Sequence, residues 1–298
     1  SLPPLPTTPG TPRALVWVFD ATDLGPAAGG TPLTIVELFG DTPRALAATP
    51  DGATVHAAIF MSGNQTTTVT EGAVCDGGAA AADCPLDGVQ VAGGLDGGRV
   101  PGGVPAPNDD VDGEPGPEVG LIVRRDPATG IWRDELGRNW NNAVRFELPD
   151  LDVFRLDALA DPPRQTAAIA HVGTVLFNMA VHPTSGALFV SNTEARNEVR
   201  FEGSGARGTT LRGHQHESRV TVIDGATVLP RHLNKHIRAQ PQGYLTRPMP
   251  PGVAQASLST PLDLTISSQG TVYVAGFGSA AVGVYDAAAL ADDRFTPD

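Results

Sequence analysis

The sequence has few charged and few aromatic residues, and it has no long apolar segment. Charged side chains make up 18% and aromatic side chains 5% of the 298 residues. No apolar run approaches the roughly 20 residues that span a bilayer, so we expect no membrane span. The formal charge of −13 disfavours nucleic acid and anionic membranes as partners, because both repel an acidic surface. A diffuse acidic surface is also ordinary for a soluble protein.

Cysteine is scarce as well, and the two that are present lie close together. Cys75 and Cys84 flank the Gly/Ala-rich loop of "VCDGGAAAADCP", a spacing that suits a local disulfide. Such a bridge implies an oxidising compartment, so we expect a periplasmic or extracellular location. Two free thiols are the alternative, and a zinc site has only Asp76 and Asp83 nearby. The spacing excludes a haem attached covalently to this chain through Cys-x-x-Cys-His.

Glycine and proline, in contrast, are abundant. With 35 Gly and 27 Pro, the chain is expected to fold into many short elements joined by tight turns. Three segments share one pattern, in which two alternating apolar stretches flank a polar turn that ends in glycine, as in a β-hairpin. These segments are Pro43–Phe60 with Gly52, Leu176–Thr193 with Gly186, and Pro261–Gly278 with Gly270.

A second recurring unit is a strand that ends in aspartate. It occurs in "LVWVFDATD", "DVFRLDALA", "SRVTVIDGA" and "AVGVYDAAA", which place the aspartate at Asp20, Asp157, Asp224 and Asp286. The successive spacings of 137, 67 and 62 residues exceed the roughly 40 to 50 residues of a propeller blade. We therefore expect insertions, which in repeat proteins gather in loops on one face, commonly the binding face.

These repeats resemble a known family. "TPRALAATPDGATVHAA" and "TVYVAGFGSAAVGVYDAAAL" look like blades of the YVTN and lactonase-like β-propeller family, which implies four-stranded blades around a channel, usually seven of them. A lactonase-like member would hold a channel metal with carboxylates and amides; Asn178 and Asp263 are the polar residues near inner-strand positions, where capping a buried turn is the alternative. Four further stretches are similar to propeller portions of bacterial secreted proteins that work with c-type cytochrome domains: "PEVGLIVRRD", "WRDELGRNW", "LPDLDVFRLDA" and "RHLNKH".

The repeats are too few for a closed ring. Three hairpins and a leading outer strand make about half of a seven-bladed propeller, and an open half would leave unpaired edges and exposed apolar faces. Either residues 61–149 conceal degenerate blades, with the hairpin "VGLIVRRDPATGIWRDEL" as part of one, or another polypeptide completes the ring. We predict an all-β propeller of four-stranded blades over residues 1–298, incomplete within this chain, with a Gly/Pro-rich insertion at about 71–149. The chain would then be a fragment of a larger propeller or one of two chains that form it.

Four of the seven histidines lie in one stretch and are candidate ligands of a transition metal: His214, His216, His232 and His236. Imidazoles at i and i+2 of a strand, or at i and i+4 of a helix, share a side and can chelate zinc or copper. The surrounding Arg and Lys side chains oppose a cation, and Glu217 and Asn234 are further candidate ligands. If the pairs lie at opposite ends of "SRVTVID", they are about 20 Å apart unless the loops fold back. Polar loop residues or a docking surface are the alternative.

An acidic stretch, "PNDDVDGEPGPEV", matches the first half of a calcium-binding loop. Alternating oxygen ligands followed by glycine wrap a hard cation. The match is incomplete, because the first ligand is Asn, the twelfth position is Val119, and two prolines stiffen the loop. A looser calcium site and a solvated acidic turn both remain open. The candidate ligands are Asn108, Asp110, Asp112, Glu114 and Glu118.

No catalytic constellation accompanies the repeats, and the G-x-S-x-G elbow of hydrolases is absent. We therefore expect a secreted or periplasmic binding and scaffolding module for a partner protein, either a chain that completes the ring or a c-type cytochrome. The alternative is a propeller component of a redox or metal-dependent enzyme, and a weaker alternative is a lactonase-like hydrolase. Trp132 and Trp140 either pack the interior or form an aromatic binding platform.

Overall fold

The computed structural model describes residues 14–26, 28–69, 73–86, 98–106, 114, 120–144, 148, 150–197, 214–246 and 248–296. The chain divides into two compact units. The first comprises residues 1–63, 149–195 and 216–298, and the second comprises residues 64–148 and 196–215. The second unit is thus inserted into the first at two places.

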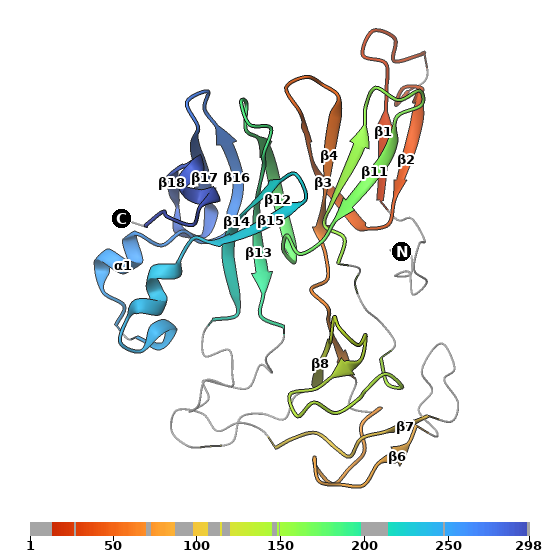
Figure 1. Ribbon diagram of the computed structural model, residues 1–298, viewed down its shortest axis with the longest axis vertical. Helices are drawn as coiled ribbons and strands as arrows, with labels where there is room; N and C mark the ends of the chain where they lie inside the picture. Colours follow the sequence, from red (N-terminus) through yellow and green to blue (C-terminus); the bar gives the residue numbers. More distant parts are fainter. Residues whose placement is uncertain are drawn as a thin grey trace. The chain divides into compact units, whose positions relative to one another are not determined.

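The described part of the first unit contains thirteen strands, all paired antiparallel, which we divide into four groups in chain order (Figure 1). Group I is β1 (Ala14–Val18) and β2 (Thr34–Leu38). Group II is β3 (Asp41–Ala48), β4 (Thr54–Met61), β10 (Val153–Asp157) and β11 (Arg164–Ile169). Group III is β12 (Val175–Val181), β13 (Leu188–Ala195), β14 (His216–Asp224) and β15 (Thr227–His232). Group IV is β16 (Pro261–Ile266), β17 (Thr271–Gly276) and β18 (Ala281–Asp286).

The three predicted hairpins are confirmed as β3–β4, β12–β13 and β16–β17. The turn glycines Gly52, Gly186 and Gly270 have φ of 69°, 75° and 83°, the left-handed conformation that glycine adopts at least cost. The register of each hairpin also shifts at the same place in its first strand, next to Ala45, Asn178 or Asp263. The repeat in the sequence is therefore a repeat in backbone geometry.

Three of the four predicted aspartate-ended strands end at that residue: Asp157 closes β10, Asp224 closes β14 and Asp286 closes β18. Asp20 instead lies two residues after β1, in an isolated bridge to Asp23. The side chain of Asp286 accepts a hydrogen bond from the backbone N–H of Ala289 and so caps the next helix.

Each group packs its apolar face on the next. One cluster joins groups I and II through Val16 and Phe154, a second joins groups II and III through Val153 and Leu188, and a third joins groups III and IV through Val222 and Val274. Neighbouring residues of a strand point to opposite sides, so an inner group presents a rear face to the preceding group and a forward face to the following one. We use these two names below.

The first unit is all-β, and its curled antiparallel strands are compatible with an incomplete propeller. Groups II and III join into one eight-stranded sheet through a single residue pair, Met61 with Val175. The helices are short: η2 (Lys235–Ala239), η3 (Gly243–Leu245), α1 (Pro251–Gln255), η4 (Phe277–Ser279) and α2 (Ala287–Ala291). None of the helices in the described ranges is long and apolar enough to cross a membrane.

The second unit contains short strands around a small core of its own. β5 (Thr66–Val69), β8 (Leu121–Arg125) and β9 (Trp132–Arg133) form one sheet, and β6 (Cys84–Pro85) pairs with β7 (Arg99–Val100). The pairing of β8 with β9 confirms the hairpin that was predicted around "DPATG". Its core includes Leu121, Val123 and Trp140.

Candidate functional site

The forward face of group IV is apolar and exposed. Val284 pairs with Tyr273, as Val222 pairs with Phe189 one group earlier. The two valines thus hold the same place in the repeat, yet Val222 is 1% exposed and Val284 is 60% exposed. Phe189 and Tyr273 differ in the same way, at 2% and 41%. Group IV therefore carries the face that group III buries, with Val282 as its third exposed apolar residue.

The rear face of group I is also apolar and exposed. Ala14 and Val16 of β1 point into the cluster shared with group II, so the alternating Leu15 and Trp17 point away from it. Trp17 is 52% exposed, pairs with Ile35 of β2, and stacks on Phe19 at 6.3 Å between ring centroids. Both ends of the series of groups consequently present uncovered apolar faces. Exposed apolar patches of this kind mark interaction sites.

A groove of about 440 Å³ runs along β18. It is lined by the whole strand from Ala281 to Asp286, by residues 255–258 and by Phe295. In group III, β15 lies beside β14 at the equivalent edge. Among the described strands, β18 pairs with β17 alone, so its outer edge faces the groove.

Charged residues gather on one face of the sheet at the start of β14. Glu217 is buried and accepts hydrogen bonds from Arg219, at 2.6 Å, and from Arg238. Arg219 also lies 3.7 Å from Glu194, which pairs with Glu217 across β13 and β14. Burial opposes the ionisation of Glu217, but the hydrogen bond from Arg219 and the positive charges around it hold its pKa below the usual value. The carboxylate is thus held by two guanidinium groups.

His232 lies diagonally across from Glu217, because it pairs with Arg219. Its Nδ1 lies 3.3 Å from the carbonyl oxygen of Ser218, and its Nε2 contacts the hydroxyl of Tyr244. A carbonyl only accepts, so Nδ1 carries the proton and Nε2 accepts from Tyr244. Burial lowers the pKa of His232, which favours this neutral form. Its ring therefore has a structural partner at each nitrogen.

Of the two arrangements considered for the histidine-rich stretch, the structure shows the one in which the chain folds back. β15 turns back along β14 and returns His232 to a position opposite Arg219, three residues from His216. The sequence pattern missed β15 because it contains Pro230, which cannot donate to a ladder. β15 is the edge of its sheet, where proline is tolerated.

The remaining residues of this stretch are placed as follows. His216 is exposed at the first position of β14. His236 lies in η2, and its Nε2 is 3.1 Å from Ser257 Oγ. The side-chain amide of Asn234 donates to the carbonyl oxygen of Leu258 and accepts from the N–H of the same residue. His214 is counted with the second unit, where its Nδ1 lies 3.2 Å from Arg196.

Most of the predicted calcium loop lies outside the described residues, namely Asn108, Asp110, Asp112 and Glu118. Glu114 is described and is exposed. Trp132 and Trp140 are 7% and 0% exposed, so they pack the core of the second unit and present no aromatic platform.

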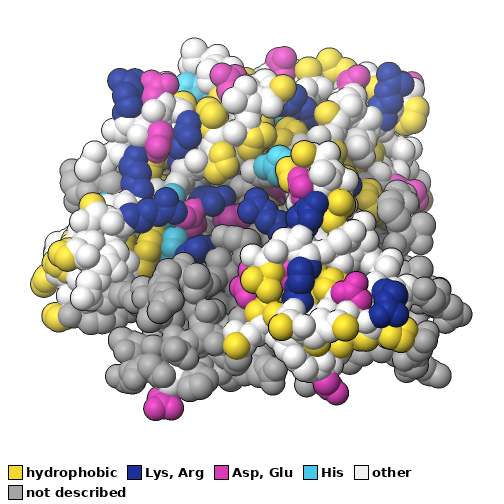
Figure 2. Space-filling view, turned by 60° about the horizontal axis from the view of Figure 1, so that its bottom comes forward, with side chains coloured by type: hydrophobic (Ala, Val, Ile, Leu, Met, Phe, Trp, Pro, Cys, Tyr) yellow, Lys and Arg dark blue, Asp and Glu magenta, His cyan; other side chains and the backbone are white. Residues whose placement is uncertain are grey.

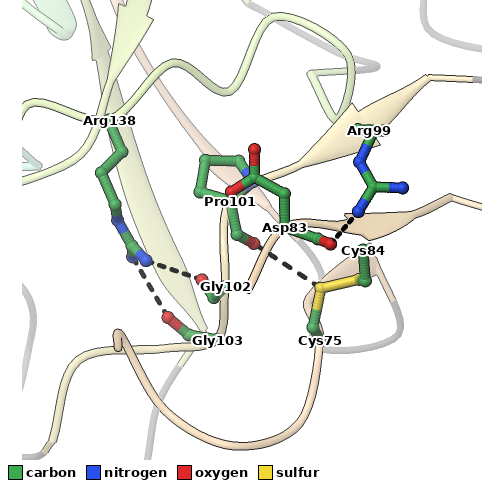
Figure 3. Close-up of a disulfide and its surroundings, with 8 residues drawn as sticks. All are labelled: Cys75, Asp83, Cys84, Arg99, Pro101, Gly102, Gly103 and Arg138. Atoms are coloured by element: carbon green, nitrogen blue, oxygen red, sulfur yellow. Dashed lines mark hydrogen bonds between the residues drawn. A yellow bond between two sulfur atoms is a disulfide. The ribbon is translucent and has the colours of Figure 1, made fainter. Parts of the chain in front are cut away.

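The predicted disulfide between Cys75 and Cys84 is present, with 6.2 Å between the Cα atoms (Figure 3). Cys75 Sγ lies 3.6 Å from the carbonyl oxygen of Pro101, and Arg138 reaches the adjacent carbonyl oxygen of Gly102 at 2.6 Å. The bridge thus closes the loop between residues 75 and 84, and the guanidinium group of Arg138 donates to the carbonyl group of Gly102 in the segment beside it.

Sequence reasoning missed the network that supports this loop. Asp134 is buried and accepts from Arg138 Nε at 2.6 Å and from the indole N–H of Trp140 at 3.0 Å. Arg138 also lies over the Trp140 ring at 5.3 Å from its centre. The sequence does carry a signal for this network, because Asp134, Arg138 and Trp140 lie within seven residues of one another in "RDELGRNW". A short pattern of this kind specifies a network only once the turn brings the side chains together.

Charges on the surface shown in Figure 2 are mixed in sign. Basic, acidic and histidine side chains intersperse there with hydrophobic ones. Among the described residues on this face, the basic side chains therefore form no broad patch of the kind that binds nucleic acid.

No protein-family model matches the chain, and no curated protein matches it. A solved structure titled "Kuenenia stuttgartiensis Hydrazine Synthase" is similar at 14% sequence identity and a TM-score of 0.35, over 89% of this chain and 70% of that one.

Proposed function

We propose that this chain is a secreted or periplasmic β-propeller module that binds and positions a partner protein. The observation that supports this most is the contrast between Val222 and Val284, which hold the same repeat position at 1% and 60% exposure. A face that is buried wherever a neighbouring group follows it is built to be covered. The rear face of group I, with Trp17, adds a second surface of the same kind.

The partner contributes further β-structure. The uncovered faces belong to sheets, and inside the first unit such faces are covered by other antiparallel groups. The groove beside β18 also fits an added strand, because an unpaired strand edge is a template for backbone pairing. An antiparallel sheet protein satisfies both features.

The disulfide supports the location. Cys75 and Cys84 are bonded, and such bridges form and persist in oxidising compartments. The periplasm and the extracellular space are both of this kind.

The rival function, a metal-dependent or redox component, would use the histidine-rich stretch. In the first unit Glu217 is held by Arg219 and Arg238, and His232 is held by Ser218 and Tyr244. Two guanidinium groups beside a carboxylate oppose a cation, which weighs against a metal there.

Site-directed photo-crosslinking tests the binding function. A photoreactive phenylalanine analogue replaces Val284 or Trp17, and in the control it replaces the exposed turn residue Gln269. Each variant is exported to the periplasm of the cell that produces it. We expect adducts of one defined mass from positions 284 and 17 and none from position 269. The partner is identified from the adduct and purified in its free form. Calorimetry then measures its affinity for the unmodified chain.

Two results would contradict the proposal. Absence of adducts at both faces means that neither is covered by a protein. Equal adducts at position 269 mean that the crosslinks report random encounter.

A further inference from the structure

The two uncovered faces are of opposite kinds. The face of group I that carries Leu15 and Trp17 is a rear face, because Val16 on the other side points toward group II. The face of group IV that carries Val282 and Val284 is a forward face, because Val274 points back toward group III. Inside the first unit, each forward face packs on the rear face of the next group. The ends therefore offer one half each of the contact that is repeated between the groups.

We propose that a second copy of this chain covers both faces. The rear face of each copy packs on the forward face of the other. This inference rests on the proposed binding function and names the partner. The described part of the first unit has thirteen strands. The smallest propellers have four blades of four strands, or about sixteen strands in all. Two copies supply twice the strands of one, and a head-to-tail contact made twice closes on itself.

The chemistry of the two faces suits this contact. The forward face is apolar at Tyr273, Val282 and Val284, and strand alternation places Asp263 of β16 and Asp286 at the end of β18 on the same side as its charged residues. The rear face places Trp17 beside Ile35, and Glu37 is the charged residue that pairs with Leu15 there. A Trp set against apolar side chains is a typical centre of binding energy. Each copy carries a formal charge of −13, so the copies repel at long range, and salt weakens that repulsion.

Sedimentation equilibrium and native mass spectrometry of the whole oxidised chain test the proposal. We expect a dimer whose dissociation constant falls as NaCl rises from about 50 to 300 mM, since screening reduces the repulsion and leaves the apolar contact. Val284→Lys and Trp17→Lys each weaken the dimer at least tenfold. Thr227→Lys, at an exposed position of β15, is the matched control and leaves the dimer unchanged. Circular dichroism verifies that each variant is folded.

Mixing the two variants distinguishes this arrangement from others. Trp17→Lys chains retain the forward face and Val284→Lys chains retain the rear face, so a mixed dimer keeps one intact contact. We expect mixed dimers, seen by isotopic labelling of one variant, at concentrations where neither variant dimerises alone. A dimer made by like faces would lose association with one of these variants and keep it with the other.

Each other outcome overturns the inference. A chain that stays monomeric at all concentrations has no second copy as its partner, and a dimer that is insensitive to both face variants uses another surface. In either case, crosslinks from positions 284 and 17 to a different protein preserve the binding function, and their absence removes it too.

Discussion

Asn178 Nδ2 donates to Asp263 Oδ1 across 2.5 Å, which joins β12 of group III to β16 of group IV. The side-chain Oδ1 of Asn178 also accepts from the backbone N–H of Met179, and Oδ1 of Asp263 accepts from that of Leu264. Both residues sit at the register shift of their strand. The pair thus links equivalent points of two neighbouring repeats, and the sequence had indicated both residues without indicating that they bond each other.

Exchange of the two groups tests this link. Asn178→Asp sets two carboxylates against each other and should lower the free energy of unfolding by about 1 to 2 kcal/mol. The double variant Asn178→Asp with Asp263→Asn restores a donor and an acceptor and should recover most of that loss. Urea unfolding followed by circular dichroism measures both. Additive losses in the double variant would contradict the pairing.

Lysine at the two equivalent valines should have opposite effects on stability. Val222→Lys buries an ammonium group among apolar side chains and should lower the free energy of unfolding by more than about 4 kcal/mol or prevent folding. Val284→Lys changes a side chain that is 60% exposed and should cost less than about 1 kcal/mol. Thermal unfolding of the dilute chain gives both values. A large loss from Val284→Lys would mean that this side chain is buried in the isolated chain.

Two buried ionisable groups should give opposing pH dependence. Burial raises the pKa of Asp152 to about 7, and the hydroxyl of Ser62 and the backbone N–H of Val172 donate to its carboxyl. Because the folded pKa lies above the unfolded value, the stabilisation is present below pH 4 and is lost as pH rises toward 7. Burial lowers the pKa of His56 to about 4, so its contribution is present above pH 6.5 and is lost as pH falls toward 4.

Single variants should separate the two. Relative to the unchanged chain, Asp152→Asn should lose stability as pH falls from 7 to 4, and His56→Gln should gain it, each by about 3 kcal/mol over that range. Urea unfolding at pH 4.5, 5.5, 6.5 and 7.5 gives the differences, in which the shared contributions of other groups cancel. A pH-independent difference for either variant would show that its pKa is unshifted.

Removal of the disulfide should weaken the second unit. Cys75→Ala with Cys84→Ala frees a short loop in the unfolded chain and should cost about 2 to 3 kcal/mol. In a Trp17→Phe background, Trp132 and Trp140 are the remaining tryptophans, and both lie in the core of this unit. Their fluorescence during urea unfolding measures the change. Reduction of the unaltered cysteines in the same background should produce the same shift.

The strands were predictable where the pattern is local. Each of these patterns is short: a stretch of alternating apolar and polar residues lies within about ten residues of its turn glycine, such as Gly186, or of its closing aspartate, such as Asp224. These features located the three hairpins and the ends of three further strands. β15 was missed because Pro230 breaks the pattern, and only its place at a sheet edge explains why the strand forms.

The surroundings of the candidate residues were not predictable from spacing. Glu217 was considered as a metal ligand, and the structure surrounds it with Arg219 and Arg238, the second of which lies 21 residues away. The contrast between Val222 and Val284 is also invisible in the sequence, since both are apolar residues in similar strands. Exposure depends on which group follows, and that is a property of the whole chain.

The bond between Ser62 and Asp152 has a consequence for how this chain tolerates its insertion. Closing an unstructured loop of about 90 residues costs roughly 3 kcal/mol more than closing a tight turn, because the penalty grows only with the logarithm of length. Here the departing and returning segments are tied together where they leave and re-enter group II. We therefore expect this junction to be a grafting point, at which a short turn or a foreign domain replaces residues 64–148 while β4 still pairs with β10.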